Sequence, residues 1–323
     1  GDHRDLHSFP TRRSSDLNQY YALKEYDLFF LDPEEIESVK TEVAVLKSLD
    51  HPHIIKVHDS FMNDSNSTFF IVMEFAEGGN LTHEIETHKG TPFQESEIIE
   101  WLNQLTSALI YIQKHNILHR DLNTNNIFLT KSCQIKLGDF GIGAMLKGAR
   151  SVITTPFTAR YAAPEVIENE AYSSKSEMWS LGVILHELCE RKPTFQDNSL
   201  RSLFNKICSG NHSKISSDNY STHLIEIIET LLSLSPDNRI DPVRLDLSLK
   251  SGLHWSNFKS PASHRICREY LEIKDNLDYI VEFINSDIHH WRITFTGPDG
   301  TPYEGGSFQI SYRYPPDYPF KPP

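Results

Sequence analysis

Several features that would mark whole classes of protein are absent from this sequence. No uninterrupted apolar run among its 323 residues reaches the roughly 18 that a membrane-spanning helix needs, and the amino terminus has no signal-peptide pattern. Basic residues are few, because 31 Lys and Arg face 44 Asp and Glu, and they form no basic stripe. Cysteines are scarce and too far apart for metal-binding pairs: Cys133, Cys189, Cys208 and Cys267. We therefore expect no membrane or nucleic-acid partner, reduced thiols, and a cytoplasmic location with the nucleus as the alternative.

The chain length suggests about two domains, and 38% hydrophobic residues with 18 Phe and 13 Tyr suffice for packed cores. Residues 7–17 resemble the peptide encoded by one reading frame of a sequencing-adapter oligonucleotide. They have neither helical nor strand periodicity. We predict that residues 1–17 are a non-native, adapter-derived segment and give them no part in the fold.

Three oxygen-bearing side chains at fixed spacing give the strongest local signal. Asn126 follows Asp121 by five residues, and Asp139 follows Asn126 by thirteen, directly before Phe140-Gly141. A loop carboxylate, an amide and a second carboxylate can align a hydroxyl with a phosphate held by Mg²⁺. The spacing carries this signal, because His3–Leu6 repeats the His-Arg-Asp-Leu letters without the later partners. The pattern predicts phosphoryl transfer.

The same residues resemble the catalytic and metal-binding loops of protein kinases. Residues 18 to about 252 resemble the NIMA-related serine/threonine kinases in particular, with local matches at Tyr21–Glu25, Ile71–Gly79, Asn126–Thr130 and Lys136–Gly143. The resemblance implies an α+β, two-lobed protein kinase fold over residues 18–255. It also implies ATP and Mg²⁺ as cofactors and a protein serine or threonine as the acceptor.

Roles for single residues follow from this resemblance. Asp121 would orient the substrate hydroxyl and accept its proton, while Asn126 and Asp139 would hold magnesium. Lys24, in a strand-like Ala-x-Lys segment, would position the ATP phosphates, and Glu42 would pair with Lys24.

The resemblance also identifies a nucleotide-binding hinge and its supports. Met73 stands at the gatekeeper position, and backbone groups of Glu74 and Ala76 would face the adenine edge. Helical periodicity predicts helices over Pro33–Leu49 and Ser96–His115, the second of which would support the catalytic loop.

Regulation and structural support are expected after the Asp-Phe-Gly segment. Arg120 would bind a phosphate on the activation loop, with Thr154 or Thr155 as its carrier. Thr158 matches the threonine that lies beside the catalytic aspartate of serine/threonine kinases. A buried ion pair is expected between the carboxylate of Ala163-Pro164-Glu165 and the guanidinium of Arg239.

Three departures from the kinase pattern bear on activity. No glycine-rich loop precedes Lys24; Asn123 stands where serine/threonine kinases have a catalytic lysine; and Glu177 replaces an aspartate that supports the catalytic loop. The loss of one preorganised donor can lower a rate roughly 10²–10³-fold, so Asn123→Lys is predicted to raise turnover. The alternative function is a pseudokinase scaffold linked to a second module.

That second module spans residues 260–323. Alternating apolar residues over Trp291–Phe295 and Phe308–Tyr312 predict antiparallel strands joined by a Gly/Pro turn, after a helix over His264–Ile273. With the closing Tyr318–Pro323, this resembles the first half of a ubiquitin-conjugating enzyme core, a partial α+β fragment. The small lobe of the preceding kinase fold is expected to be truncated. An RWD-type interaction fold is the alternative.

No cysteine is available for thioester chemistry in this segment. Cys267 falls within the expected first helix, and we predict no ubiquitin-conjugating activity from the fragment. Ubiquitin-pathway partners follow only if both segments belong to one gene, which the residues leave open.

Overall fold

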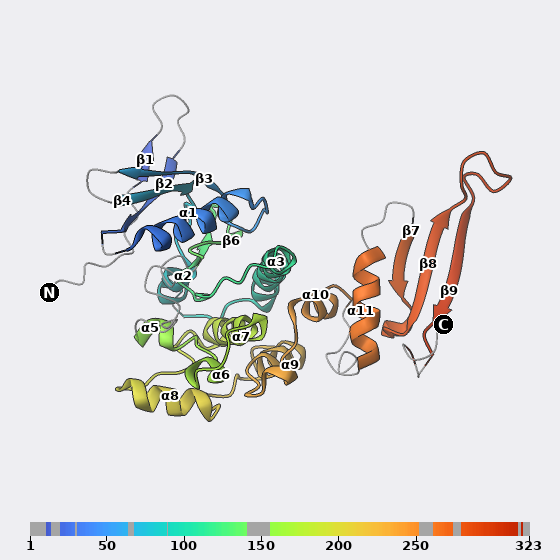
Figure 1. The fold of residues 1–323 in the computed structure, drawn as a ribbon. Coiled ribbons are helices and arrows are strands. Elements are labelled where there is room, and N and C mark those ends of the chain that lie inside the picture. The colour runs from blue at the N-terminus through green and yellow to red at the C-terminus, as the bar shows by residue number, and fades with distance from the viewer. Residues whose placement is uncertain are drawn as a thin grey trace. The chain divides into compact units, whose positions relative to one another are not determined.

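The computed structural model describes residues 11–13, 20–29, 31–63, 68–88, 90–140, 156–251, 261–273, 279–315 and 318. They fall into two compact units, residues 1–220 with 228–239 and residues 221–227 with 240–323. Helices and sheets occur in both units (Figure 1), which confirms the predicted α+β class. Among the described residues no helix is long and apolar enough to span a membrane.

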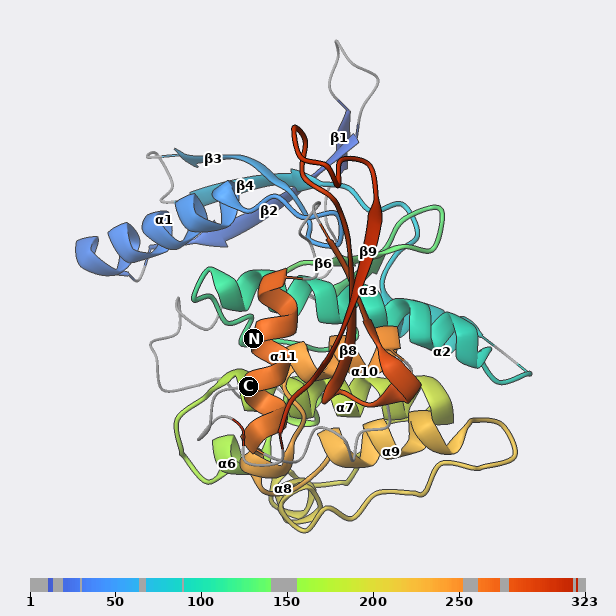
Figure 2. The same ribbon diagram turned by 90° about the vertical axis from the view of Figure 1, so that its right-hand side faces the viewer.

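A four-stranded antiparallel sheet with the order β1-β2-β4-β3 begins the first unit. Helix α1 (Pro33–Ser48) lies against this sheet in both views (Figure 1, Figure 2). Its first turn is closed by a capping box between Asp32 and Glu35. The strands are β1 (Thr11–Arg13), β2 (Tyr20–Asp27), β3 (Val57–Asn63) and β4 (Thr68–Glu74).

Strand β1 lies within the segment that the sequence left out of the fold. Thr11 pairs with Ala22 and Arg13 with Tyr20. Three residues of this segment are therefore part of the sheet although they show no strand periodicity, and the adapter origin of residues 1–17 stays a prediction. A strand ladder uses backbone groups, so the open edge of β2 can be paired by a segment without apolar alternation.

The larger part of the first unit is mainly helical. Helix α7 is buried along most of its length, and Gly182 allows close packing there, because a Cβ at this position would lie 2.8 Å from Leu231 Cβ. The elements are α2 (Leu81–Thr87), α3 (Glu95–Lys114), β5 (Ile127–Leu129), β6 (Ile135–Leu137), α5 (Pro156–Ala159), α6 (Pro164–Ile167), α7 (Ser174–Glu190), α8 (Leu200–Cys208) and η1 (Pro236–Asn238). Helix α9 (Thr222–Leu231) has residues in both units.

The second unit is a three-stranded antiparallel sheet with helices. Strand β8 (His290–Thr296) lies between β7 (Tyr279–Phe283) and β9 (Ser307–Arg313), and Phe295 pairs with Phe308 as the predicted alternation requires. The helices are α10 (Pro242–Ser251), α11 (Pro261–Ile273) and η3 (Ile284–Ser286).

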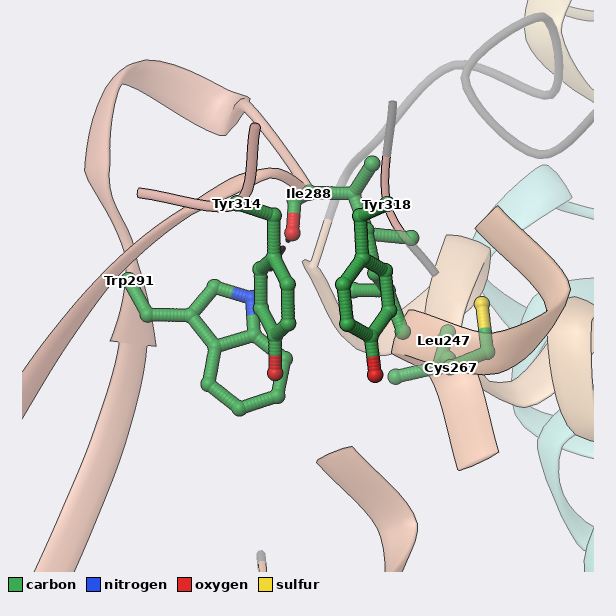
Figure 3. Close-up of a cluster of buried hydrophobic side chains, with 7 residues drawn as sticks. Leu247, Cys267, Ile288, Trp291, Tyr314 and Tyr318 are labelled. Carbon is green, nitrogen blue, oxygen red and sulfur yellow. Dashed lines mark hydrogen bonds between the residues drawn. The ribbon is translucent and has the colours of Figure 1, made fainter. Parts of the chain in front are cut away.

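The core of the second unit includes a residue from helix α10. Leu247 belongs to one cluster with residues of α11, of β8 and of the segments beside the strands (Figure 3), namely Ile266, Cys267, Ile288, Trp291, Tyr314 and Tyr318. Trp291 is only 2% exposed, whereas Phe295 and Phe308 are half-buried. The sheet is thus covered at its Trp291 end and more open at the other.

Candidate active site

The loop that follows α3 is held by a buried carboxylate. The backbone N–H groups of His119 and Arg120 both donate to Glu177 Oε1, the second at 3.1 Å. Burial raises the pKa of Glu177 to about 7 although both bonds act to lower it. Arg120 has a φ of 65°, which is unusual outside glycine. Glu177 therefore supports the loop despite its extra methylene.

His119 connects this loop to the segment before Asp139. Burial lowers the pKa of His119, and the neutral ring donates from Nε2 to the Gly138 carbonyl at 2.8 Å. Its Nδ1 accepts from the Asp121 N–H at 3.3 Å. The His119 and Phe140 ring centroids lie 4.7 Å apart. These contacts place the two carboxylate-bearing loops side by side.

Asp121 and Asn126 lie in direct contact. Asn126 Nδ2 donates to Asp121 Oδ2 at 3.0 Å and to the Asp121 carbonyl at 2.7 Å. The Asn126 carbonyl accepts from Gly138 N–H at 2.9 Å. A side chain at position 138 would collide with Ile55 and Phe128, so glycine is needed for this approach.

Lys24 reaches the site from β2, but its partner differs from the expected one. Its Nζ lies 2.8 Å from Asp139 Oδ1. Burial acts to lower the pKa of Lys24, but the Asp139 charge and hydrogen bond outweigh it and raise that pKa. The predicted Lys24–Glu42 pair is therefore wrong for this structure.

Glu42 itself is not paired with Lys24. Within the described part of the chain its Oε2 is buried and has no hydrogen-bond partner. Burial raises the pKa of Glu42, and the charge of Arg120 lowers it only in part. The physical reason for the changed pairing is that Lys24 can neutralise one of two carboxylates, and Asp139 lies within direct hydrogen-bond distance.

The hinge expected to hold adenine begins at the end of β4. Met73 is 8% exposed and lines a small cavity together with Lys24, Asp139 and Phe140. The Glu74 N–H donates to the Lys56 carbonyl at 2.8 Å, so an adenine contact from this residue would use its carbonyl. The predicted roles of Met73, Glu74 and Ala76 in binding nucleotide stay predictions.

A salt bridge missed at the sequence level ties this hinge down. The Glu74 carboxylate lies 2.7 Å from Lys136 Nζ and accepts the Lys56 N–H at 3.1 Å. It thereby connects β4 to β6.

Thr158 and Arg120 line one concavity with Asp121. Arg120 is exposed, as a side chain that binds phosphate must be, whereas Thr154 and Thr155 lie outside the described residues. The predicted structural ion pair is present, because Arg239 donates to both oxygens of Glu165 at 2.7 and 2.8 Å.

Comparison with known proteins identifies the family to which these residues belong. Residues 11–245 match the protein kinase domain family. The chain belongs to the protein kinase family. Serine/threonine-protein kinase Nek1 of Mus musculus is 37% identical to it over 231 residues, which is 70% of this chain and 19% of that protein.

Two further relatives of this kinase have similar coverage. Serine/threonine-protein kinase Nek5 of Homo sapiens is 37% identical over 227 residues, 69% of the chain and 31% of the relative. Probable serine/threonine-protein kinase nek3 of Dictyostelium discoideum is 41% identical over 225 residues, 68% and 20%. The kinase chain thus spans about a fifth to a third of these relatives, and its predicted likeness to NIMA-related kinases is confirmed.

Residues 265–323 match the ubiquitin-conjugating enzyme family, as predicted for the second module. Cys267 is 1% exposed, and burial raises the pKa of its thiol to about 12. A buried thiol of this kind is a poor nucleophile.

The kinase also contains a buried polar network that sequence reasoning missed. Tyr161 Oη donates to Glu187 Oε2 at 2.6 Å and lies 2.8 Å from Thr124 Oγ1 of the catalytic loop. Burial raises the pKa of Glu187 to about 7. The available signal was a carboxylate within the apolar stretch Val183–Cys189, a pattern that indicates a buried partner.

Proposed function

We propose that this chain transfers the γ-phosphate of ATP to serine or threonine side chains of a protein. One observation carries the proposal: Lys24, Asp121, Asn126 and Asp139 are joined in one connected set. Lys24 contacts Asp139, Asn126 contacts Asp121, and the Asn126 carbonyl bonds to the residue before Asp139. Phosphoryl transfer depends on positioning and on charge stabilisation, which such a set supplies.

The residues present fit a magnesium ion. The Asn126 side-chain nitrogen donates to Asp121, so the amide oxygen points away from Asp121 and could bind a metal ion. Asp139 would add a carboxylate ligand. Hard oxygen donors in small number suit Mg²⁺, which shares its coordination with water and substrate phosphates. When bound with ATP, the ion would neutralise charge on the phosphates.

The protein side chains have separate tasks in this proposal. Asp121 orients the acceptor hydroxyl and takes its proton, because its carboxylate is held at the loop surface by hydrogen bonds. Lys24 forms an ion pair with Asp139 in this structure. When ATP binds, the Lys24 ammonium would contact the ATP phosphates in place of the Asp139 carboxylate. Thr158 shares the concavity of Asp121, which supports an aliphatic hydroxyl acceptor, as do the names of the relatives.

Phosphate incorporation tests this function. The full chain is incubated with Mg²⁺, γ-labelled ATP and a generic serine/threonine protein substrate, beside an Asp121→Asn variant. We expect labelled phosphoserine or phosphothreonine only with the unaltered chain. Equal incorporation by both chains would contradict the kinase function. If neither chain transfers label although ATP binding is measured, the scaffold alternative is favoured.

A further inference from the structure

Position 123 contacts the carboxylate that is proposed to accept the substrate proton. Asn123 Nδ2 donates to Asp121 Oδ1 at 2.9 Å and to the Asp121 carbonyl at 3.0 Å. Its Oδ1 accepts the Asn125 N–H at 2.9 Å. Asn123 is 2% exposed, so these bonds are made away from bulk water, where they restrict the side chain most strongly.

Asn126 makes the matching contact from the other side. It donates to Asp121 Oδ2 at 3.0 Å, while Asn123 donates to Oδ1. Each carboxylate oxygen therefore accepts from a different amide. Two such bonds fix the plane of the carboxylate and still leave lone pairs for a substrate hydroxyl.

We propose that Asn123 is a positioning residue that, together with Asn126, fixes the orientation of the Asp121 carboxylate. This inference rests on the proposed kinase function and deepens it. It assigns position 123 a role of its own, in place of a missing positive charge. A neutral amide orients the carboxylate without placing a positive charge beside it.

Variants of position 123 in the full chain separate this role from general damage. Asn123→Ala removes every side-chain contact, whereas Asn123→Asp keeps an acceptor for the Asn125 N–H, loses the donor to Asp121 and adds a negative charge beside it. Asn125→Ala is the matched control, because it changes the neighbouring asparagine and keeps the backbone N–H that Asn123 accepts. The readouts are kcat, KM for ATP, and the pH dependence of kcat.

We expect kcat of Asn123→Ala to fall roughly 10- to 100-fold with KM for ATP changed less than about twofold, because misorientation of a catalytic group acts mainly on turnover. Asn123→Asp should lose a similar factor, and its rate should decline at a higher pH on the acid side, because two adjacent carboxylates hold a proton more tightly. Asn125→Ala should stay within about twofold of the unaltered chain.

Two results would overturn the inference while Asp121→Asn remains inactive and the kinase function stands. They are full turnover in Asn123→Ala and an equal loss in Asn125→Ala. Equal label transfer by the unaltered chain and Asp121→Asn would remove the kinase function and this catalytic role with it. Amide exchange at Asn125 checks the geometry separately: it should be faster in Asn123→Ala than in Asn123→Asp, and equal rates would overturn the contact.

Discussion

Lys24 and Glu42 are unpaired with each other: the Lys24 ammonium lies 2.8 Å from Asp139, and Glu42 Oε2 is buried with no hydrogen-bond partner among the described residues. A carboxylate in this position destabilises the ligand-free fold because its charged form is poorly solvated. In the ATP-bound chain, where the phosphates would take Lys24 from Asp139, Glu42 is predicted to pair with Lys24. Stability and activity can therefore be tested separately at Glu42.

Replacing Glu42 by a neutral isostere should separate these two effects. Burial raises the pKa of Glu42, so the folded state holds its proton more tightly and loses stability as pH rises through that pKa. Glu42→Gln should therefore increase the free energy of unfolding at pH 8, by about 0.5–1 kcal/mol, and lower kinase turnover. Thermal melts and label transfer measure the two effects. The control is Glu37→Gln on the exposed side of α1, which should change neither; a Glu42→Gln chain that is less stable would contradict the argument.

Glu177 and Glu187 should give the protein a stability that declines towards neutral pH. Burial raises the pKa of each to about 7 from a usual 4.5. The folded state therefore binds more protons than the unfolded state between these values, and stability present below pH 4.5 is lost as pH rises to about 7. Glu177→Gln keeps an acceptor for the two loop N–H groups and should reduce this loss by about 2–3 kcal/mol. Melts between pH 5 and 8 measure the slope, and an unchanged slope in the variant would refute the assignment.

The buried ion pair of Glu165 and Arg239 should be strongly destabilised when either partner is truncated. Arg239 is fully buried and donates to both oxygens of Glu165. Removing the guanidinium leaves a buried carboxylate unpaired, which typically costs about 3–5 kcal/mol. Arg239→Ala should lower stability by this amount in denaturant melts. Lys47→Ala, which removes the half-exposed partner of the exposed Asp59, should change stability by less than about 1 kcal/mol.

Sequence reasoning was accurate where a contact follows from spacing along the chain and failed where it depends on three-dimensional choice. The helix predicted over Ser96–His115 is α3, Glu95–Lys114, because its apolar period fixes it. Asn126 lies beside Asp121 because the two residues are five positions apart in one loop, so their contact could be predicted from the spacing. The partner of Lys24 does not, since two carboxylates distant in sequence compete for it.

Two other features left no readable pattern in the sequence. The pairing of β1 with β2 uses backbone groups alone. The hydrogen bonds of Asn123 depend on loop conformation, which residue type does not specify. Contacts of the Ala76 backbone with the nucleotide stay predictions, because a backbone contact does not depend on residue type.

Residues 260–323 alone are predicted to be marginally folded, because the apolar faces of Trp291, Phe295 and Phe308 would lack cover. In this structure Phe295 and Phe308 are half-buried, whereas Trp291 is covered by a core that also contains Leu247 from α10 (Figure 3). The segment without α10 therefore loses a core residue. A truncated fragment would expose this surface and aggregate, so the test belongs in the full chain.

Cys267 provides a probe of that core, because it packs in the same cluster as Leu247 and reacts only when the cluster opens. Leu247→Ala leaves a cavity and should destabilise the second unit by about 2–3 kcal/mol. The rate of thiol alkylation at Cys267 should then rise roughly 30-fold or more, since each 1.4 kcal/mol is a factor of ten.

Cys189 is the internal control: it is also buried, its pKa is likewise raised to about 12 by burial, and it belongs to the first unit. Mass spectrometry of labelled peptides gives both rates. Acceleration at both cysteines would show that the two units open together, and no acceleration at Cys267 would show that Leu247 does not stabilise this core.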